Sequence, residues 1–235
     1  MSLFKNIFNL ACLFVASLWT LFVAIMAAIC FQFSRSLGQI FHHAFGKGGL
    51  ALMGIKVRKI GLENIPRSGC IWAPNHESLF DILLLSSLPY DFAWISKEQV
   101  GKIPFIGTAM RGMGCYFVKR NRSAHDLNIM SEVEEGLKKG AMVVIFPEGT
   151  RTRTGELLPF KKGAFKTAKN SGVPLIPMAI TGTRAIAPPG KLPSFGHNIT
   201  LRVGTPFYIA PDEDLNLAMG RYRQTLSQLL SEDRT

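Results

Sequence analysis

The sequence predicts an α/β fold, in which a central, largely parallel sheet is flanked by helices and follows an N-terminal apolar helical membrane anchor. Short apolar runs typical of strands alternate with segments of helical periodicity. Residues 7–33 contain no charged side chain. Polar side chains follow several apolar runs, as expected at the carboxyl edge of a parallel sheet. The 235 residues give room for one sizeable domain and an appendage.

The overall charge points to an anionic partner. The chain carries 27 basic and 16 acidic residues, a formal net charge of +11, which suits nucleic acid, a membrane surface or a phosphorylated substrate. The four cysteines, Cys12, Cys30, Cys70 and Cys115, are widely spaced without a CxxC pair. This spacing indicates neither a zinc site nor a disulfide framework, and it fits a reducing compartment.

The N-terminal run predicts a membrane anchor over residues 1–45, with residues 46–235 as the main domain. A spanning helix needs about 20 apolar residues, whereas the core of a signal peptide is shorter. Two arrangements fit: one spanning helix, or two shorter helices that dip into one leaflet and continue through 36–45. Basic residues are more numerous after the run, so a spanning helix places the main domain on the cytoplasmic side. The glycine-rich segment 46–54 is expected to link the two parts.

The rest of the chain alternates between strand and helix patterns. Strands are predicted at 71–73, 92–95, 115–118, 142–146, 175–180 and 199–203. Ser123 and Asp126 resemble a capping box ahead of a helix with apolar residues at 127, 130, 133 and 137. Two further helices are expected at 160–170 and 212–230, the first ended by Gly172.

The stretch NHESLFD, residues 75–81, carries the first candidate chemistry. It lies between a predicted strand and an apolar helical run. His76 and Asp81 can meet only if His76 lies in the turn and folds back onto the first turn of the helix. A carboxylate that holds an imidazole in one tautomer makes it a general base. The alternative is a histidine that is satisfied near a helix N-terminus, with Asp81 favourable against the helix dipole.

Two further strand ends carry charged residues. The segment GCYFVKR, 114–120, ends in two cations, and FPEGTR, 146–151, follows the most apolar strand. In FPEGTR, Gly149 permits a tight turn, Glu148 lies where sites of α/β proteins form, and Arg151 suits a phosphate or carboxylate. The alternative for each cation is a solvated surface charge.

These blocks, with VPLIPM at 173–178, resemble in order and spacing the four motif blocks of the glycerolipid acyltransferase family. The chain is most similar to the bacterial 1-acyl-sn-glycerol-3-phosphate acyltransferases, also called lysophosphatidic acid acyltransferases. The resemblance extends from Lys56 to about Tyr208 and includes SKEQVGKIPFIG, 96–107, and FKKGAF, 160–165. The block at 114–120 is the loosest match, although its terminal Arg120 is present.

The resemblance implies acyl transfer from acyl-CoA or acyl carrier protein to the sn-2 hydroxyl of 1-acyl-glycerol-3-phosphate, giving phosphatidic acid. His76 is then the general base and Asp81 its orienting partner. No cofactor or metal is implied, and the expected partners are lysophosphatidic acid, the thioester carrier and a phospholipid bilayer, in a bacterial inner membrane. The implied substrate-binding residues are Lys97, Arg120, Glu148, Gly149, Thr150 and Arg151. Other lysolipids or glycerol 3-phosphate remain alternative acceptors.

Other classes of protein fit the sequence poorly. A serine hydrolase of the nucleophile-elbow type needs GxSxG, which does not occur. The zinc motif HExxH fails because Phe80 stands at its last position. A nucleic-acid binder would interleave aromatic and basic residues as a stacking platform, and this chain does not.

Overall fold

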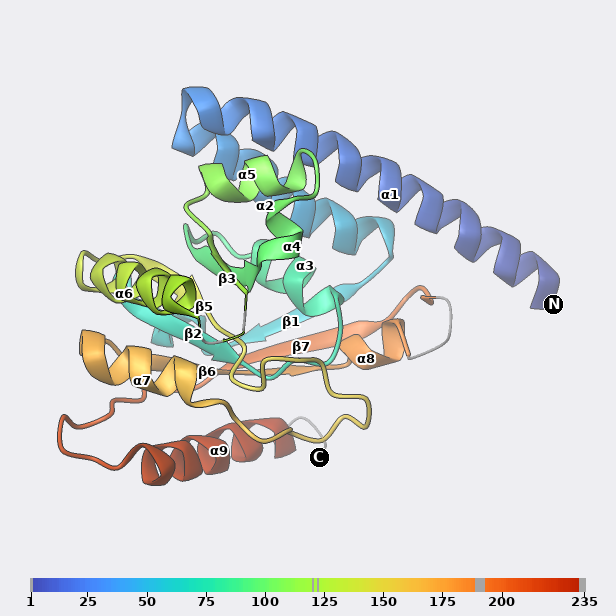
Figure 1. The fold of residues 1–235 in the computed structure, drawn as a ribbon. Helices are drawn as coiled ribbons and strands as arrows, with labels where there is room; N and C mark the ends of the chain where they lie inside the picture. Colours follow the sequence, from blue (N-terminus) through green and yellow to red (C-terminus); the bar gives the residue numbers. More distant parts are fainter. Residues whose placement is uncertain (1, 120, 122, 189–192, 233–235) are drawn as a thin grey trace.

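Seven strands form one sheet in the order β1-β7-β6-β2-β5-β3-β4 in a computed structural model of the chain (Figure 1). The strands are β1 Lys56–Ile60, β2 Cys70–Pro74, β3 Ala93–Lys97, β4 Tyr116–Val118, β5 Met142–Val144, β6 Leu175–Thr181 and β7 Asn198–Val203. Neighbouring strands are parallel except β6 and β7, which are antiparallel. The predicted largely parallel sheet is therefore confirmed. The structure describes residues 2–119, 121, 123–188 and 193–232, and the side chains from residue 7 onward.

The central strand β2 is buried on both faces, which explains its unbroken apolar sequence. Successive side chains point to opposite faces, so Cys70 and Trp72 join one core cluster and Ile71 and Ala73 the other. The first cluster includes side chains of α2 Arg35–Leu52 and α3 Phe80–Ser86. The second includes side chains of α6 Ala124–Lys138, α7 Lys162–Ser171 and α9 Leu215–Ser231. Both faces of the sheet thus carry a layer of helices.

The two helical layers lie on opposite sides of the sheet in Figure 1, with α1 Ser2–Phe33, α2 and α5 Ile106–Gly112 above it and α7 and α9 below. Short elements complete the chain: η1 Leu62–Asn64, α4 Glu98–Gly101 and α8 Thr183–Ile186. The three helices expected after residue 120 are present. Gly172 ends α7 in the left-handed conformation, with φ 72°, as a C-capping glycine does.

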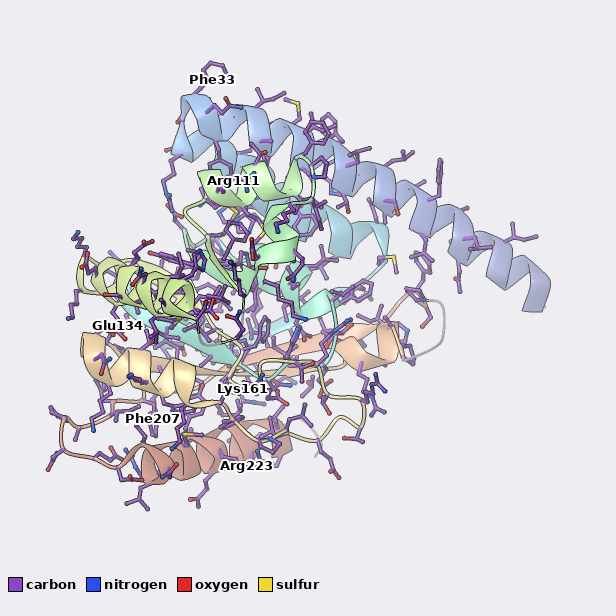
Figure 2. The ribbon with its side chains drawn as sticks, viewed as in Figure 1. Phe33, Arg111, Glu134, Lys161, Phe207 and Arg223 are labelled. Carbon is purple, nitrogen blue, oxygen red and sulfur yellow. The ribbon has the colours of Figure 1, made fainter. Side chains whose placement is uncertain are left out.

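The N-terminal region is a pair of helices that fold back on each other. Trp19 of α1 donates its indole N–H to the carbonyl of Ala44 on α2, at 3.3 Å. Phe31 packs on Gly38 near the connection, and Phe33, 82% exposed, is the last residue of α1 and lies at the top of the view in Figure 2. Within the described residues, Ile7–Phe33 is the one helix long and apolar enough to cross a membrane, with a mean hydropathy of 2.4. The exposed apolar side chains of α1 suit a lipid environment.

The expectation that residues 46–54 form a linker is wrong, because α2 continues to Leu52. Gly46 and Gly49 are buried where α2 meets α3. A Cβ atom at Gly46 would collide with the backbone of Ser86 and Ser87. The glycines of this segment therefore allow two helices to approach closely, a use that composition alone does not distinguish from flexibility.

A polar network adds to the contact between α2 and α3. His42 is buried. Its Nδ1 atom lies 3.1 Å from Oε1 of Gln39, and its Nε2 atom lies 3.1 Å from Oγ of Ser86. Gln39 and Arg35 both donate to the carboxylate of Asp91. Burial lowers the pKa of His42 to about 3, so its imidazole is neutral in the folded protein. Helix α2 is thereby joined to the sheet domain by both apolar and polar contacts.

The sequence interpretation missed β1. This strand reads KVRKI, and only Val57 and Ile60 are even partly buried. It lies at the edge of the sheet, where one neighbour and solvent replace the two neighbours of a central strand. Edge strands commonly carry lysine and other charges, which hides them from a search for apolar runs.

We expect Gly46→Ala to destabilise the protein, because the added methyl group meets backbone that cannot move aside. The expected loss is about 2 kcal/mol, typical of overpacking, or roughly 6 °C in Tm. Gly220→Ala in α9 is the matched control, since its Cβ enters open space. It should stabilise the helix by roughly 0.5 kcal/mol. Thermal unfolding in detergent measures both, and an unchanged Tm for Gly46→Ala would restore the linker interpretation.

Candidate active site

The candidate site lies at the carboxyl ends of the central strands. β2 ends at Pro74, and residues 75–79 form the turn that leads into α3. The side chain of Asn75 holds this turn to β6, because it donates to the carbonyl of Ile180 at 2.9 Å and accepts from the Ile180 N–H at 2.7 Å. These two bonds continue the pairing of β2 and β6 beyond the end of β2.

His76 and Asp81 meet as the spacing predicted. His76 lies in the turn, Asp81 lies in the first turn of α3, and Nδ1 of the histidine is 2.8 Å from Oδ2 of the aspartate. The aspartate is fully buried, while the side chain of His76 is 13% exposed. The pair therefore presents an imidazole to the surface and keeps its carboxylate inside the protein.

Asp81 receives further hydrogen bonds on both oxygens. Oδ2 also accepts from the N–H groups of Glu77 and Ser78, at 2.7 and 2.9 Å. Oδ1 accepts from the hydroxyl of Thr183 at 2.5 Å. An ionised carboxylate only accepts hydrogen bonds, so Nδ1 of His76 must carry the proton in this pair. Nε2 then keeps its lone pair, and it bonds to none of the residues that the structure describes.

The ring of His76 is also fixed by packing. It stacks on Phe146 with centroids 3.8 Å apart and an interplanar angle of 19°. Trp94 stacks beyond Phe146, at 6.2 Å. The backbone carbonyl of His76 accepts from the N–H of Thr152 at 2.9 Å. The imidazole is thus held in place by its ring face, its Nδ1 atom and its own backbone.

Glu148 binds backbone through both carboxylate oxygens. Oε1 accepts from the N–H of His76, and Oε2 from the N–H of Leu158, each at 2.8 Å. Burial raises the pKa of Glu148, while the hydrogen bonds from the Leu158 and His76 N–H groups and the charge of Arg223 act in the opposite direction. Glu148 therefore joins the histidine turn to the loop that follows β5.

The loop after β5 is held at several other points. Arg223 of α9 donates to the carbonyls of Leu157 and Leu158, and its guanidinium lies 5.5 Å from the centre of the Phe160 ring. Arg184 donates to the carbonyl of Thr154. These contacts fix residues 152–160 without any regular secondary structure.

A polar pocket of about 510 Å³ lies beside the Glu148 turn and carries three lysines. Its lining residues are Lys97, Gln99, Lys119, Gly149, Thr150 and Lys161. Gly149 has φ 68°, in the left-handed region that favours glycine. Lys161 lies at mid-height in the molecule, between α5 above and α9 below (Figure 2). The pocket suits an anionic group.

Asp126 fixes the backbone at Lys119, one of the residues that line this pocket. Its carboxylate accepts from the N–H of Lys119 at 2.7 Å and of Asn121 at 3.0 Å. Ser123 accepts from the Asp126 N–H at 3.3 Å, so half of the predicted capping box is present. The other half differs, because the Asp126 carboxylate binds the segment after β4 and the Ser123 N–H bonds to Asn121 Oδ1. The helix α6 thereby positions the chain on both sides of residue 120.

The structure brings together most of the predicted site residues. His76, Asp81 and Glu148 form one hydrogen-bonded group, and Lys97, Gly149 and Thr150 line the adjacent pocket. Arg151 is exposed and is not one of the lining residues of that pocket. Arg120 lies outside the described residues. Within the described part of the chain, no group of three or more His, Cys, Asp or Glu side chains could hold a metal ion.

Besides Lys119, which stood in GCYFVKR without a binding role, three contributors were missed by the sequence interpretation. Lys161 stood in the quoted segment FKKGAF, but a lysine pair before a helix does not reveal that one member turns toward a pocket. Asn75 stood in NHESLFD without a role, and its bonds to β6 follow only from strand order. Thr183 lies 102 residues from Asp81, and no local pattern marks its hydroxyl.

Comparison with known proteins defines the class. The model of the family named Acyltransferase matches residues 56–181, more than half of the chain. The chain therefore belongs to the acyltransferase family.

Individual relatives agree with this class. A chloroplastic 1-acyl-sn-glycerol-3-phosphate acyltransferase of Brassica napus is 41% identical over 63% of this chain and 44% of its own. The Pseudomonas aeruginosa enzyme of the same name is 34% identical over 55% of this chain and 49% of its own. The crystal structure of the 1-acyl-sn-glycerophosphate acyltransferase of Thermotoga maritima superposes with a TM-score of 0.80, at 26% identity, over 97% of both chains. The chain spans about half the length of the curated relatives it matches.

We expect Glu148→Gln to destabilise the protein by about 2 kcal/mol, because the new amide group turns a donor toward one of two part-buried N–H groups. Acyl transfer should slow as the His76 turn loosens. Glu156→Gln, on an exposed residue of the same loop, is the matched control and should stay within about 0.5 kcal/mol. Chemical unfolding measures both variants. Equal stability of Glu148→Gln and wild type would show that the Glu148 carboxylate does not hold the histidine turn to the loop after β5.

Proposed function

We propose that the protein transfers an acyl chain from acyl-CoA or acyl carrier protein to the sn-2 hydroxyl of 1-acyl-glycerol-3-phosphate, which gives phosphatidic acid. The observation that carries this proposal is the imidazole of His76, held by a buried carboxylate, beside a pocket that carries three lysines. The names of the relatives, each a 1-acyl-sn-glycerol-3-phosphate acyltransferase, support the choice of acceptor.

The geometry suits direct attack by the acceptor hydroxyl. Nε2 of His76 removes the hydroxyl proton as the oxygen attacks the thioester carbonyl, because Nδ1 already carries the proton shared with Asp81. The tetrahedral intermediate collapses with cleavage of the C–S bond. The imidazolium then returns its proton to the departing thiolate, which restores the base. The acceptor oxygen is itself the nucleophile, so no acyl-enzyme intermediate is needed.

The lysine pocket suits the phosphate of the acceptor. Lys97, Lys119 and Lys161 contribute three positive charges to its lining. Arg120 and Arg151 are assigned to the same phosphate in this proposal on the basis of the family resemblance. A phosphomonoester carries up to two negative charges at neutral pH and so matches this pocket better than a phosphodiester.

The N-terminal helices suit a lipid acceptor and product that stay in a membrane. We place the protein at a bacterial inner membrane, with residues 46–235 on the cytoplasmic side, on the basis of the apolar helix α1 and the basic residues that follow it. The positive net charge favours an anionic leaflet and an acidic carrier protein.

The test of this function is a transfer assay with purified protein in detergent. It offers lysophosphatidate, glycerol 3-phosphate and lysophosphatidylethanolamine, each with acyl-CoA and with acyl carrier protein. We expect phosphatidic acid from lysophosphatidate to form fastest. Transfer only to glycerol 3-phosphate or only to lysophosphatidylethanolamine would overturn the choice of acceptor.

His76→Ala should lower kcat by at least about 100-fold, the usual contribution of a general base, while the fold is kept. His197→Ala is the matched control, since His197 contacts Ser194 in a loop outside the site. Circular dichroism and Tm check that both variants fold. Turnover near that of the wild type in His76→Ala would remove the general base from the mechanism.

A further inference from the structure

Thr183 is a buried polar residue to which the sequence motifs assign no role. It is the first residue of α8 and is 0% exposed, and its hydroxyl lies 2.5 Å from Oδ1 of Asp81. The hydroxyl of Thr183 donates this hydrogen bond to the carboxylate. Among the described residues, Thr183 supplies the hydrogen bond to Oδ1, while the other three donors all reach Oδ2.

The position of this hydroxyl is fixed by the end of β6 and by the turn that follows it. The Asn75 side chain fixes Ile180 on β6 through two hydrogen bonds. Gly182 follows in the left-handed region, with φ 89°, and a Cβ atom there would collide with the carbonyl of Asn198. The chain therefore turns sharply after β6 and delivers Thr183 beneath α3. Asn75 precedes His76 directly, so the contacts form a closed ring from His76 through Ile180, Thr183 and Asp81 back to His76.

We propose that Thr183 is a positioning residue of the His76–Asp81 pair, which fixes the orientation of the Asp81 carboxylate through Oδ1. A carboxylate can rotate about its Cβ–Cγ bond, and donors on one oxygen alone leave that rotation less constrained. With Thr183 on Oδ1 and two N–H groups on Oδ2, the plane of the carboxylate is set, and Oδ2 faces Nδ1 of His76. Thr183 touches neither substrate nor the transferred proton and acts through Asp81. The inference rests on the proposed function of this pair.

Thr183→Val tests the inference because it keeps the shape of the side chain and removes the donor. We expect kcat to fall about tenfold, as for the loss of a hydrogen bond to a charged group, with unchanged KM for acceptor and donor. Thr183→Ser keeps the hydroxyl and should restore most of the rate. Thr167→Val is the matched control, since Thr167 is equally buried but lies in α7, on the opposite face of the sheet, and it should leave kcat unchanged.

A double substitution separates positioning from a general loss of structure. In a His76→Ala background the base is already absent, so Thr183→Val should slow the residual reaction no further. An equal fall in both backgrounds would overturn the inference, and so would Thr183→Val with the kcat of the wild type. If Thr183→Val does not fold, Thr183→Ser and Thr183→Ala give the same comparison, with a fall in kcat expected only for alanine.

A spectroscopic readout keeps the inference distinct from the proposed function. The Nδ1 proton of a histidine bonded to a carboxylate gives a far-downfield proton signal, which His76→Ala assigns by its loss. We expect Thr183→Val to move or broaden this signal, and Thr167→Val and Thr183→Ser to leave it in place. An unmoved signal in Thr183→Val would contradict the positioning role. Failure of the wild-type protein to transfer acyl chains to any acceptor would instead reject the proposed function.

Discussion

The structure of the site depends on one buried carboxylate. An ionised side chain without solvent is strongly unfavourable unless donors surround it. Asp81 meets this requirement with two backbone N–H groups of its own turn, the hydroxyl of Thr183 and the Nδ1–H of His76. The same four bonds that make burial of the charge possible also decide the tautomer of His76. The hydrogen bonds that stabilise the turn therefore also prepare His76 to act as a base.

The sheet supplies the donors from distant parts of the chain. β2 brings His76, β6 brings Thr183 and β5 brings Glu148, and all three follow the carboxyl ends of parallel neighbours. Glu148 has both oxygens on backbone N–H groups, so it holds the histidine turn and the loop after β5 in one arrangement. That loop carries Thr150 and Lys161 to the lysine-lined pocket. Hydrogen bonds to the backbone, and not loop packing alone, thus fix the position of His76 relative to the pocket.

Much of this could be predicted from the sequence, for reasons that are local. The apolar runs of the buried strands revealed the sheet, and the five-residue spacing of His76 and Asp81 required the turn that the structure contains. The features that could not be predicted are those that depend on neighbours in space. The charged edge strand β1 has few buried positions, the glycines of α2 serve close packing against α3, and Thr183 reaches Asp81 only through the order of the strands. Single-sequence patterns describe periodicity and spacing, whereas these features belong to pairs of elements.

In this site Asp81 holds His76 with its proton on Nδ1 and its lone pair on Nε2. Nitrogen NMR of protein labelled with 15N-histidine tests this directly, since protonated and unprotonated ring nitrogens resonate far apart. His76→Ala assigns the resonances of His76 among the five histidines of the chain. At mildly alkaline pH we expect a protonated Nδ1 and an unprotonated Nε2. A proton on Nε2 and none on Nδ1 would contradict it.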